Sequence, residues 1–375
     1  MLGQVRKLIA PAGSPDRATS HSPDPSTLTD ATVACETTYV TSSRVSRRLA
    51  CILAAAVICS VPAHADAKKR ARNPLCSTLS KRAKGPVVAV FSAFPAEAKA
   101  LVAATKVEST IELGGRPYYL GRIGRVRVVL GLLGIGMINA EKAAIAVLDG
   151  LDVAGVIVSG VAGSNQRIAD VVISDDWVSD RAPGVFPANV AMLALAHRAQ
   201  TSLPDPFERC TRVPPTSPSG AFVCMPFEPA LVFGGRGMSG DDYATATPCG
   251  PDENEILGCA LPPPTAALLA SSARLETVPE IVDQETAAVA RVAMERDVPF
   301  LGIRAVSDGA GDPNTTVRPP FAQFFDYYQL AANNAAIVTR AVVAEIEGLK
   351  GRTGRRTCRL LAKHKWEQAA ARLGQ

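Results

Sequence analysis

Between residues 87 and 348, short apolar runs of strand length alternate with segments that have helical spacing. The strand-like runs are 87–92, 118–121, 126–130, 154–159, 171–178, 231–233 and 300–306. The helix-like segments are 95–102, 137–148, 285–295 and 321–347. Such alternation is typical of one α/β domain in which helices flank a mostly parallel or mixed central sheet. From about 205 to 280 the pattern weakens into Pro- and Cys-rich loops, which we interpret as an insertion.

The first 65 residues carry the signs of an export signal. Residues 1–43 show no apolar period, and we expect them to be disordered or untranslated. Within 44–65, three arginines precede an apolar stretch at 49–61 and a small-residue site, Ala63-His64-Ala65. This order of a basic segment, an apolar segment and a cleavage site is that of a secretory signal peptide, whereas a buried core helix, the alternative, does not require it. We therefore expect a periplasmic or extracellular protein cleaved near Ala65.

Charge divides the remaining chain into three parts. Residues 66–84 and 350–375 hold seven and eight Lys or Arg with one acid each, whereas 85–349 hold 19 basic and 29 acidic residues, a net charge of −10. We interpret 66–84 as a basic linker, 85–348 as the folded domain and 349–375 as a basic, solvated C-terminal tail, weak attachment to an anionic surface being the alternative. An acidic core without aromatic residues among the basic runs argues against nucleic-acid binding. No apolar run reaches about 18 residues, so we expect no stable membrane insertion.

Six cysteines remain after cleavage, and an even number in an exported protein favours disulfides. One arrangement pairs Cys210 with Cys224, Cys249 with Cys259 and Cys76 with Cys358. These six cysteines allow fifteen connectivities, and free buried thiols are the alternative. Four histidines and no Cys-x-x-Cys pair leave little material for a zinc site. We expect neither metal nor cofactor.

Seven short motifs follow one another in the order found in the nucleoside phosphorylase/nucleosidase superfamily. They are Ser92-Ala93-Phe94-Pro95-Ala96-Glu97, Gly134-Ile135-Gly136, Ser159-Gly160-Val161-Ala162-Gly163, Asp170-Val171-Val172-Ile173-Ser174-Asp175, Ser239-Gly240-Asp241-Asp242-Tyr243, Val282-Asp283-Gln284-Glu285-Thr286-Ala287 and Arg304-Ala305-Val306-Ser307-Asp308. Each motif alone is weak, but together the chain most resembles the 5′-methylthioadenosine/S-adenosylhomocysteine nucleosidases over about 87–348. The resemblance implies a single-domain, three-layer fold and, as in that family, a homodimer.

The resemblance assigns roles to three carboxylates. Cleavage of a purine nucleoside needs an acid beside the purine N7 and a base for the incoming water, which are the two carboxylate roles of an inverting glycosidase. Asp308, at the end of a buried strand, takes the acid role and Glu97 the base role. Glu285 is then expected to accept hydrogen bonds from the ribose hydroxyls. Without the resemblance, Asp308 fits a strand-end turn, Glu285 a helix start and Glu97 a solvated helix.

The remaining substrate-binding candidates are carried over in the same way. Tyr243 would stack on the base while the backbone of Ala244 reads its edge, although Tyr243 could equally anchor a loop. The backbone at Ala162 and Gly163 would approach the ribose, and Phe94 and Ile135 would line the ribose and the 5′ side. Gln284 stands where the family has methionine, so the sugar or its 5′ substituent is expected to differ.

Three functions remain open on the sequence. Residues 92–98 contain no Arg or Lys to hold a phosphate, which favours hydrolysis of a purine nucleoside such as methylthioadenosine over phosphorolysis. A non-catalytic nucleoside-binding or storage protein is the third alternative. The joint presence of Glu97, Glu285 and Asp308 argues against it. Arg304 is interpreted as ordering the end of its strand rather than as binding phosphate.

Overall fold

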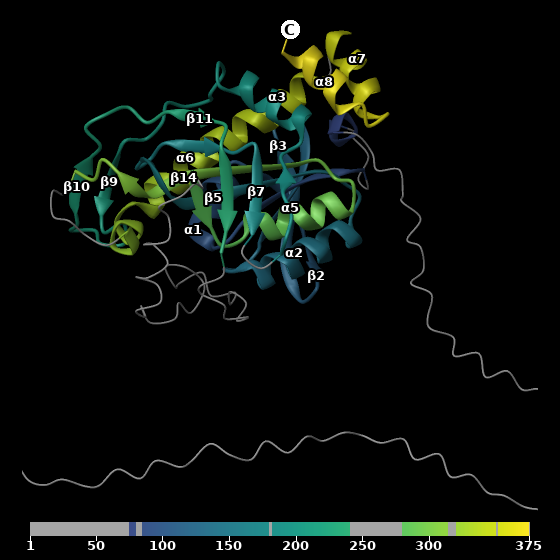
Figure 1. Cartoon of the computed structure of the whole chain (residues 1–375). Coiled ribbons are helices and arrows are strands. Elements are labelled where there is room, and N and C mark those ends of the chain that lie inside the picture. Colours follow the sequence, from purple (N-terminus) through teal and green to yellow (C-terminus); the bar gives the residue numbers. More distant parts are fainter. Residues whose placement is uncertain are drawn as a thin grey trace, which may run out of the picture. The chain divides into compact units, whose positions relative to one another are not determined.

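The computed structural model describes residues 75–79, 85–179, 182–240, 280–313, 320–349 and 352–374. Within these ranges, twelve strands form one mixed sheet (Figure 1). They are β1 (Val87–Ser92), β2 (Lys106–Leu113), β3 (Arg116–Ile123), β4 (Val126–Leu132), β5 (Val153–Arg167), β6 (Val171–Ile173), β7 (Asp176–Ser179), β8 (Phe186–Pro187), β11 (Leu231–Phe233), β12 (Arg236–Ser239), β13 (Ile281–Asp283) and β14 (Phe300–Ala310). The predicted α/β class is confirmed.

The centre of the sheet is parallel and fully covered. β1 lies between β4 and β5 and pairs with both in parallel, and β14 pairs in parallel with β5 on its other side. All six residues of β1 are buried, as its continuous apolar run requires of a strand covered on both faces. β3 and β4 form the predicted antiparallel hairpin, and β2 adds an exposed edge strand.

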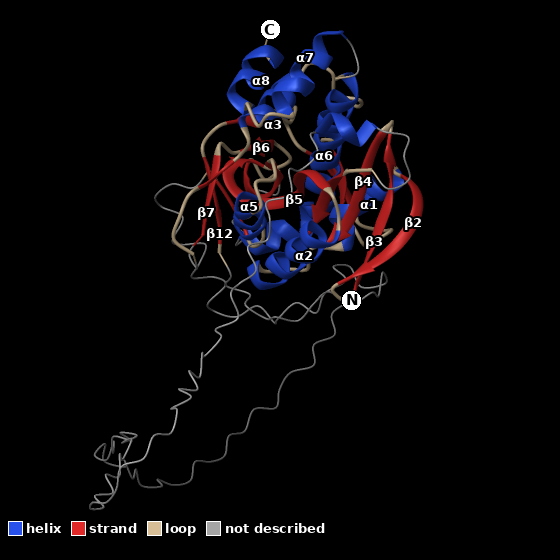
Figure 2. Ribbon diagram, turned by 90° about the vertical axis from the view of Figure 1, so that its right-hand side faces the viewer, coloured by secondary structure: helices blue, strands red, loops and turns tan. Residues whose placement is uncertain are grey.

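Helices cover both faces of this sheet (Figure 2). They are α1 (Pro95–Ala103), α2 (Met137–Gly150), α3 (Val190–Ala199), α5 (Thr286–Glu295), α6 (Pro320–Gly348), α7 (Arg352–Leu361) and α8 (Trp366–Leu373), with a short 3-10 helix, η1 (Leu75–Leu79). One core cluster joins α1, α3 and α6 to the sheet, and a second joins α2 and α5 to it. The result is the three-layer arrangement that the resemblance implies.

Several elements differ from those expected. β5 and β14 run past their glycines to Arg167 and Ala310, because the two strands keep pairing through irregularities in register. The single strand expected at 171–178 is two strands, β6 and β7, which pair with β11 and β12 respectively. β2 and α3 were not predicted. Asn189 caps α3 by accepting hydrogen bonds from Ala191 N and Met192 N, a capping pattern that the sequence shows.

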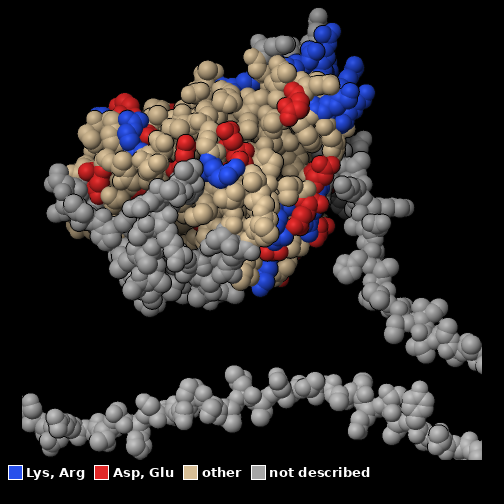
Figure 3. All heavy atoms as spheres, in the orientation of Figure 1, with Lys and Arg blue, Asp and Glu red and all other residues tan. Residues whose placement is uncertain are grey.

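The C-terminal segment is helical, which corrects the expectation of a solvated tail. In α7 and α8, Leu361, Ala369 and Leu373 are buried in the core cluster that includes α3, and Cys358 forms a disulfide with Cys76 of η1. The basic side chains stay outside, and Figure 3 shows Lys and Arg gathered over these helices. A few apolar anchors and one covalent link therefore hold a segment that its charge alone would leave in solvent.

A second disulfide closes a small hairpin inside the insertion. β9 (Cys210–Val213) and β10 (Ala221–Cys224) pair antiparallel with Cys210 opposite Cys224, and the two sulfurs are bonded. Two of the three expected pairs are thus present. Cys249 and Cys259, together with the segments 1–43 and 44–65, lie outside the described residues. No helix in the described ranges has the length and apolar character that crossing a membrane requires.

Candidate active site

The candidate site lies where β1, β13 and β14 meet β5. Glu97 follows β1 in the first turn of α1, Glu285 directly follows β13, and Arg304 and Asp308 belong to β14. All three strands pair with β5, so residues far apart in the sequence converge on its segment 159–163. The carboxyl ends of parallel strands are the usual place for ligand sites in open α/β sheets.

Glu97 is buried and fixed by backbone donors. Its Oε1 accepts a hydrogen bond from Val161 N at 2.7 Å, and its Oε2 accepts one from Ala93 N at 2.5 Å. A Cβ at Gly160 would lie 2.3 Å from Glu97 Oε1, so glycine is needed for this close approach. Burial raises the pKa of Glu97, while Arg304 and the two backbone N–H groups act in the opposite direction.

Arg304 is the centre of a buried charge cluster. Its side chain is 0% exposed and forms ion pairs with Asp283 Oδ2 at 2.8 Å, Glu285 Oε2 at 3.1 Å and Glu97 Oε1 at 3.4 Å. Its Nη1 also donates to Val161 O at 3.2 Å. The neighbouring carboxylates outweigh burial and raise the pKa of Arg304. Three carboxyl groups thus face one guanidinium, and the cluster favours an extra proton.

Glu285 is the carboxyl that best holds this proton. Burial, together with the nearby Asp283 and Glu97, raises the pKa of Glu285 to about 8 against the opposing effect of Arg304. Its Oε1 accepts a hydrogen bond from Gly136 N at 3.0 Å, so the Gly134-Ile135-Gly136 turn contacts the cluster directly. A neutral Glu285 near pH 7 relieves part of the repulsion among the three acids.

Asp283 orders the start of α5 and was missed as part of the site. Its Oδ1 accepts hydrogen bonds from Glu285 N and Thr286 N, both at 3.1 Å, and the hydroxyls of Ser239 and Thr286 also donate to its carboxylate. It therefore links β12, β13 and Arg304. The motif from Val282 to Ala287 contains it, but its position before the ribose candidate gave no sign that it pairs with Arg304.

Asp308 lies apart from the Arg304 cluster on the same strand. Burial raises its pKa to about 6 against the opposing effect of the Ser307 hydroxyl, which donates to its Oδ1 at 2.7 Å. A Cβ at Gly163 would lie 2.6 Å from Asp308 Oδ2, so the carboxyl lies against bare backbone of β5. A carboxyl with this pKa can give up a proton near neutral pH.

The other predicted residues are placed as follows. Phe94 is buried. Its ring packs edge-on against the rings of Phe324 and Tyr328, with centroid distances of 6.2 Å and 6.3 Å respectively. Ala162 and Gly163 lie on β5 beside Asp308, and Ile135 lies in the turn that binds Glu285. Oε1 of Gln284 is buried and has no hydrogen-bond partner among the described residues. Tyr243 and Ala244 lie outside the described residues.

The described residues of the site form no evident metal-binding set. In the described part of the chain, His, Cys, Asp and Glu side chains form no group of three that could hold a metal ion. The three clustered carboxylates of the site surround Arg304, and its guanidinium supplies the positive charge among them.

Comparison with known proteins gives consistent matches. A protein of Mycobacterium tuberculosis named only as uncharacterised is 32% identical over 184 residues, which are 44% of this chain and 73% of that protein. A 5′-methylthioadenosine/S-adenosylhomocysteine nucleosidase of Tolumonas auensis is 26% identical over 63% of this chain and 90% of its own. The crystal structure of a Neisseria meningitidis nucleosidase of the same name, in complex with methylthio-immucillin-A, is 22% identical with a TM-score of 0.48, covering 68% of this chain and 98% of that one.

The family assignment rests on a match that spans both halves of the sheet. The family model described as the phosphorylase superfamily matches residues 87–226 and 259–344, which together are more than half of the chain. The matched ranges contain Glu97, Asp283, Glu285, Arg304 and Asp308. With its central mixed sheet and its converging carboxylates, the chain belongs to the phosphorylase superfamily.

Proposed function

We propose that the protein is an exported purine nucleosidase, which hydrolyses the N-glycosidic bond of a purine nucleoside. The observation that carries this proposal is the separation of two buried carboxyls along β5. Glu97 binds the strand at Gly160 and Val161, and Asp308 lies against it at Gly163. Three residues of a strand span about 10 Å, which leaves room for a sugar and a water between an acid and a base. Named nucleosidases among the relatives support the same activity.

The proposed chemistry uses the two carboxyls in different protonation states. Asp308, with its raised pKa, donates a proton to N7 of the leaving purine. Glu97, whose pKa is raised by burial against the effect of Arg304 and two backbone N–H groups, accepts the proton of the attacking water in its carboxylate form. Glu285 accepts hydrogen bonds from the ribose hydroxyls. These hydrogen bonds strengthen as positive charge develops on the sugar.

Hydrolysis is favoured over phosphorolysis because the buried cation, Arg304, is already paired with carboxylates of the protein. Arg304 is engaged with three carboxylates, and the loop from Ser92 to Ala98 has no Lys or Arg. A phosphate dianion entering beside Glu97 would meet an excess of negative charge and would lack the donors that a phosphate site needs. Phosphorolysis and nucleoside binding without turnover are the competing outcomes of the experiment below.

For the substrate, we propose a nucleoside whose sugar offers a hydrogen-bond donor to Gln284. Its buried Oε1 lacks a partner, and an unpaired buried polar atom rejects an apolar neighbour. The relatives named as nucleosidases act, by name, on methylthioadenosine and S-adenosylhomocysteine. We expect adenosine or inosine to be cleaved by this protein at least as well as methylthioadenosine.

Export and a homodimeric state are further parts of the proposal. The signal-like segment 44–65 and the two disulfides, Cys76–Cys358 and Cys210–Cys224, support folding in an oxidising compartment. Detection of the protein in periplasmic or culture fractions, with its first residue at Asp66, tests export. Sedimentation of the purified protein tests the dimer.

The deciding experiment incubates residues 66–375 with methylthioadenosine, adenosine and inosine, with and without phosphate, and separates the products by chromatography. Free base and free sugar without phosphate establish the hydrolase. Asp308→Asn should lower kcat by about 10²–10⁴-fold, whereas Asp205→Asn, at an exposed ion pair with Arg340, should not change it. Because the acid must be protonated, kcat/KM should fall as pH rises through about 6. Sugar 1-phosphate formed only with phosphate indicates a phosphorylase, and saturable binding without products indicates a binding protein.

A further inference from the structure

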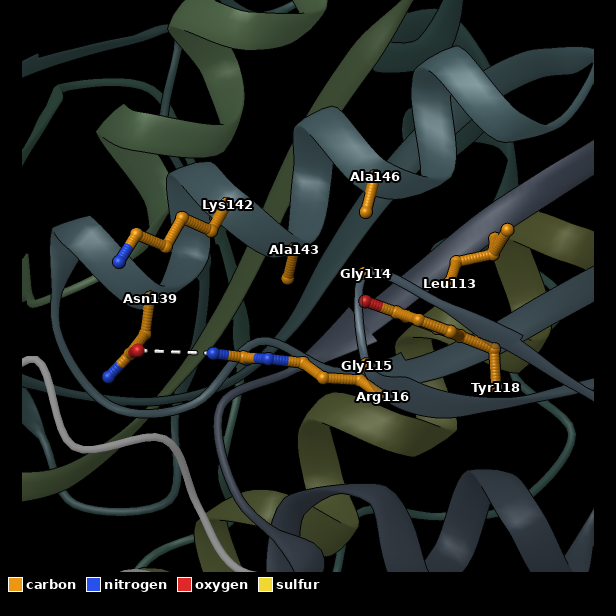
Figure 4. A pocket seen from close by; sticks show the side chains of 9 residues that line it. All are labelled: Leu113, Gly114, Gly115, Arg116, Tyr118, Asn139, Lys142, Ala143 and Ala146. Atoms are coloured by element: carbon orange, nitrogen blue, oxygen red, sulfur yellow. Dashed lines mark hydrogen bonds between the residues drawn. The ribbon is translucent and has the colours of Figure 1, made fainter.

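A hollow lies outside the candidate active site, between the turn of the β2–β3 hairpin and α2. Its volume is about 210 Å³, enough for several water molecules or a small anion. Its lining consists of Leu113, Gly114, Gly115, Arg116, Tyr118, Asn139, Lys142, Ala143 and Ala146 (Figure 4). None of these residues is a candidate for the proposed nucleosidase reaction.

Tyr118 gives this hollow a buried hydroxyl without a partner. Its ring is 0% exposed and lies against Gly131 of β4, where a Cβ would come within 2.1 Å of the ring. Within the described part of the chain its hydroxyl oxygen has no hydrogen-bond partner, and Figure 4 shows this oxygen directed toward Gly114. A buried hydroxyl is almost always hydrogen-bonded, so the position calls for an acceptor.

The lining is cationic. Arg116 donates to Asn139 Oδ1 at 3.1 Å and to Leu133 O, which fixes its guanidinium at the edge of the hollow (Figure 4). Lys142 has no ion-pair partner within the described ranges. The acids of the same helix are already paired, Glu141 with Arg291 at 2.7 Å and Asp149 with Arg296 at 2.8 Å. Among the described residues, the lining includes no Asp or Glu.

We propose that this hollow binds an oxyanion, the phosphate or carboxylate group of a small molecule. The guanidinium of Arg116 and the hydroxyl of Tyr118 donate hydrogen bonds, and Lys142 adds a positive charge to the lining, so the hollow matches a group that only accepts hydrogen bonds. The anion takes the place of the acceptor that Tyr118 lacks and neutralises the charge of Lys142. The same Arg116 and Asn139 hold Leu133 O and Ile135 O, so the hollow lies directly behind the turn that binds Glu285.

Calorimetric titration of the purified protein with inorganic phosphate, and separately with succinate, tests the proposal. Tyr118→Phe, which removes a donor to the anion, and Lys142→Met, which removes a positive charge from the lining, should each weaken binding about tenfold. Lys106→Met, at an exposed lysine of β2, is the matched control and should leave binding unchanged. Binding of both anions indicates that any oxyanion suffices, and binding of phosphate alone indicates a phosphate ester.

Phosphate held at the candidate active site would give a different pattern. Binding would then be lost in Asp308→Asn or Glu97→Gln and kept in Lys142→Met, and the proposal would be wrong. Thermal unfolding adds a second readout. Without anions, Tyr118→Phe should unfold at or above the temperature of the parent protein, because no hydrogen bond is lost, and saturating phosphate should reverse that order. A variant that is less stable without anions, or no saturable binding of either probe, would overturn the proposal.

Discussion

Arginine has opposite surroundings in two regions of this molecule. In the candidate active site, Arg304 is completely buried and pairs with Glu97, Asp283 and Glu285. In α7, Arg355 and Arg359 are exposed on a helix that is held by buried Leu361 and by the Cys76–Cys358 disulfide. Arg304 is part of the core, whereas the two arginines of α7 lie on the surface of a helix that apolar packing and a disulfide hold in place. The same charge therefore has a large effect on stability in one region and a small effect in the other.

The largest effect is expected from removing the buried charge. Arg304→Met leaves three buried carboxyls without a cation, which should lower the free energy of unfolding by about 3–5 kcal/mol. The loss should be smaller at pH 5 than at pH 8, because protonation of the acids relieves their repulsion. Arg355→Met is the matched control and should change stability by less than about 0.5 kcal/mol. Urea denaturation at both pH values measures the difference, and equal losses for the two variants would contradict the comparison.

These two regions also differ in how well the sequence predicts them. The site was located because its residues lie in short motifs at strand ends, and 87–92 and 231–233 coincide with β1 and β11. The central place of Arg304 was not predicted, since an arginine is rarely fully buried and its three partners come from separate segments. The limits of β5 and β14 were missed because glycines usually weaken strands, whereas here they make room for Glu97 and Asp308.

The C-terminal helices were missed for a different reason. Their composition is dominated by Lys and Arg, and the few apolar residues that anchor them, such as Leu361 and Leu373, have meaning only against α3 and the core. The Cys76–Cys358 pair was proposed, but a pairing of the chain ends does not by itself predict helices. Long-range packing of a short apolar stripe cannot be read from local pattern.

The second prediction concerns what holds the exposed region. Replacing both Cys76 and Cys358 by alanine should lower the free energy of unfolding by about 2–4 kcal/mol, since the bond closes almost the whole domain. Amide hydrogen exchange should rise first in α7 and α8, while the amides of β1 and β5 remain protected. The Cys210→Ala, Cys224→Ala pair is the control and should leave exchange in α7 and α8 unchanged. Uniform exchange throughout the domain would show that the bond does not act locally.

The third prediction uses the raised pKa of Glu285. Its pKa is about 8 in the folded protein against an ordinary value of 4.5, so the folded state binds the proton more tightly than the unfolded state. Stability is therefore fully present below pH 4.5 and falls as pH rises toward 8. Glu285→Gln keeps a neutral group and should gain at least about 1 kcal/mol relative to the parent protein between pH 5 and pH 9. A constant difference over this range would mean that Glu285 is ionised throughout.

The smallest effect on stability is expected from the exposed arginines of α7. Its dependence on salt concentration distinguishes it from the effect of the buried Arg304. Arg355 and Arg359 are one helical turn apart, so their like charges repel, and Arg355→Gln, which leaves the favourable charge of Arg359 in the last turn, should raise stability by about 0.2–0.5 kcal/mol at low ionic strength. This gain should vanish near 1 M salt, where charges more than about 3 Å apart in solvent are screened. The loss in Arg304→Met should persist at that salt concentration, because no ions reach a fully buried pair. Chemical denaturation of both variants in urea, with and without 1 M NaCl, compares them directly. If salt changed both variants alike, the surroundings of the two arginines would not differ in the way that their contacts indicate.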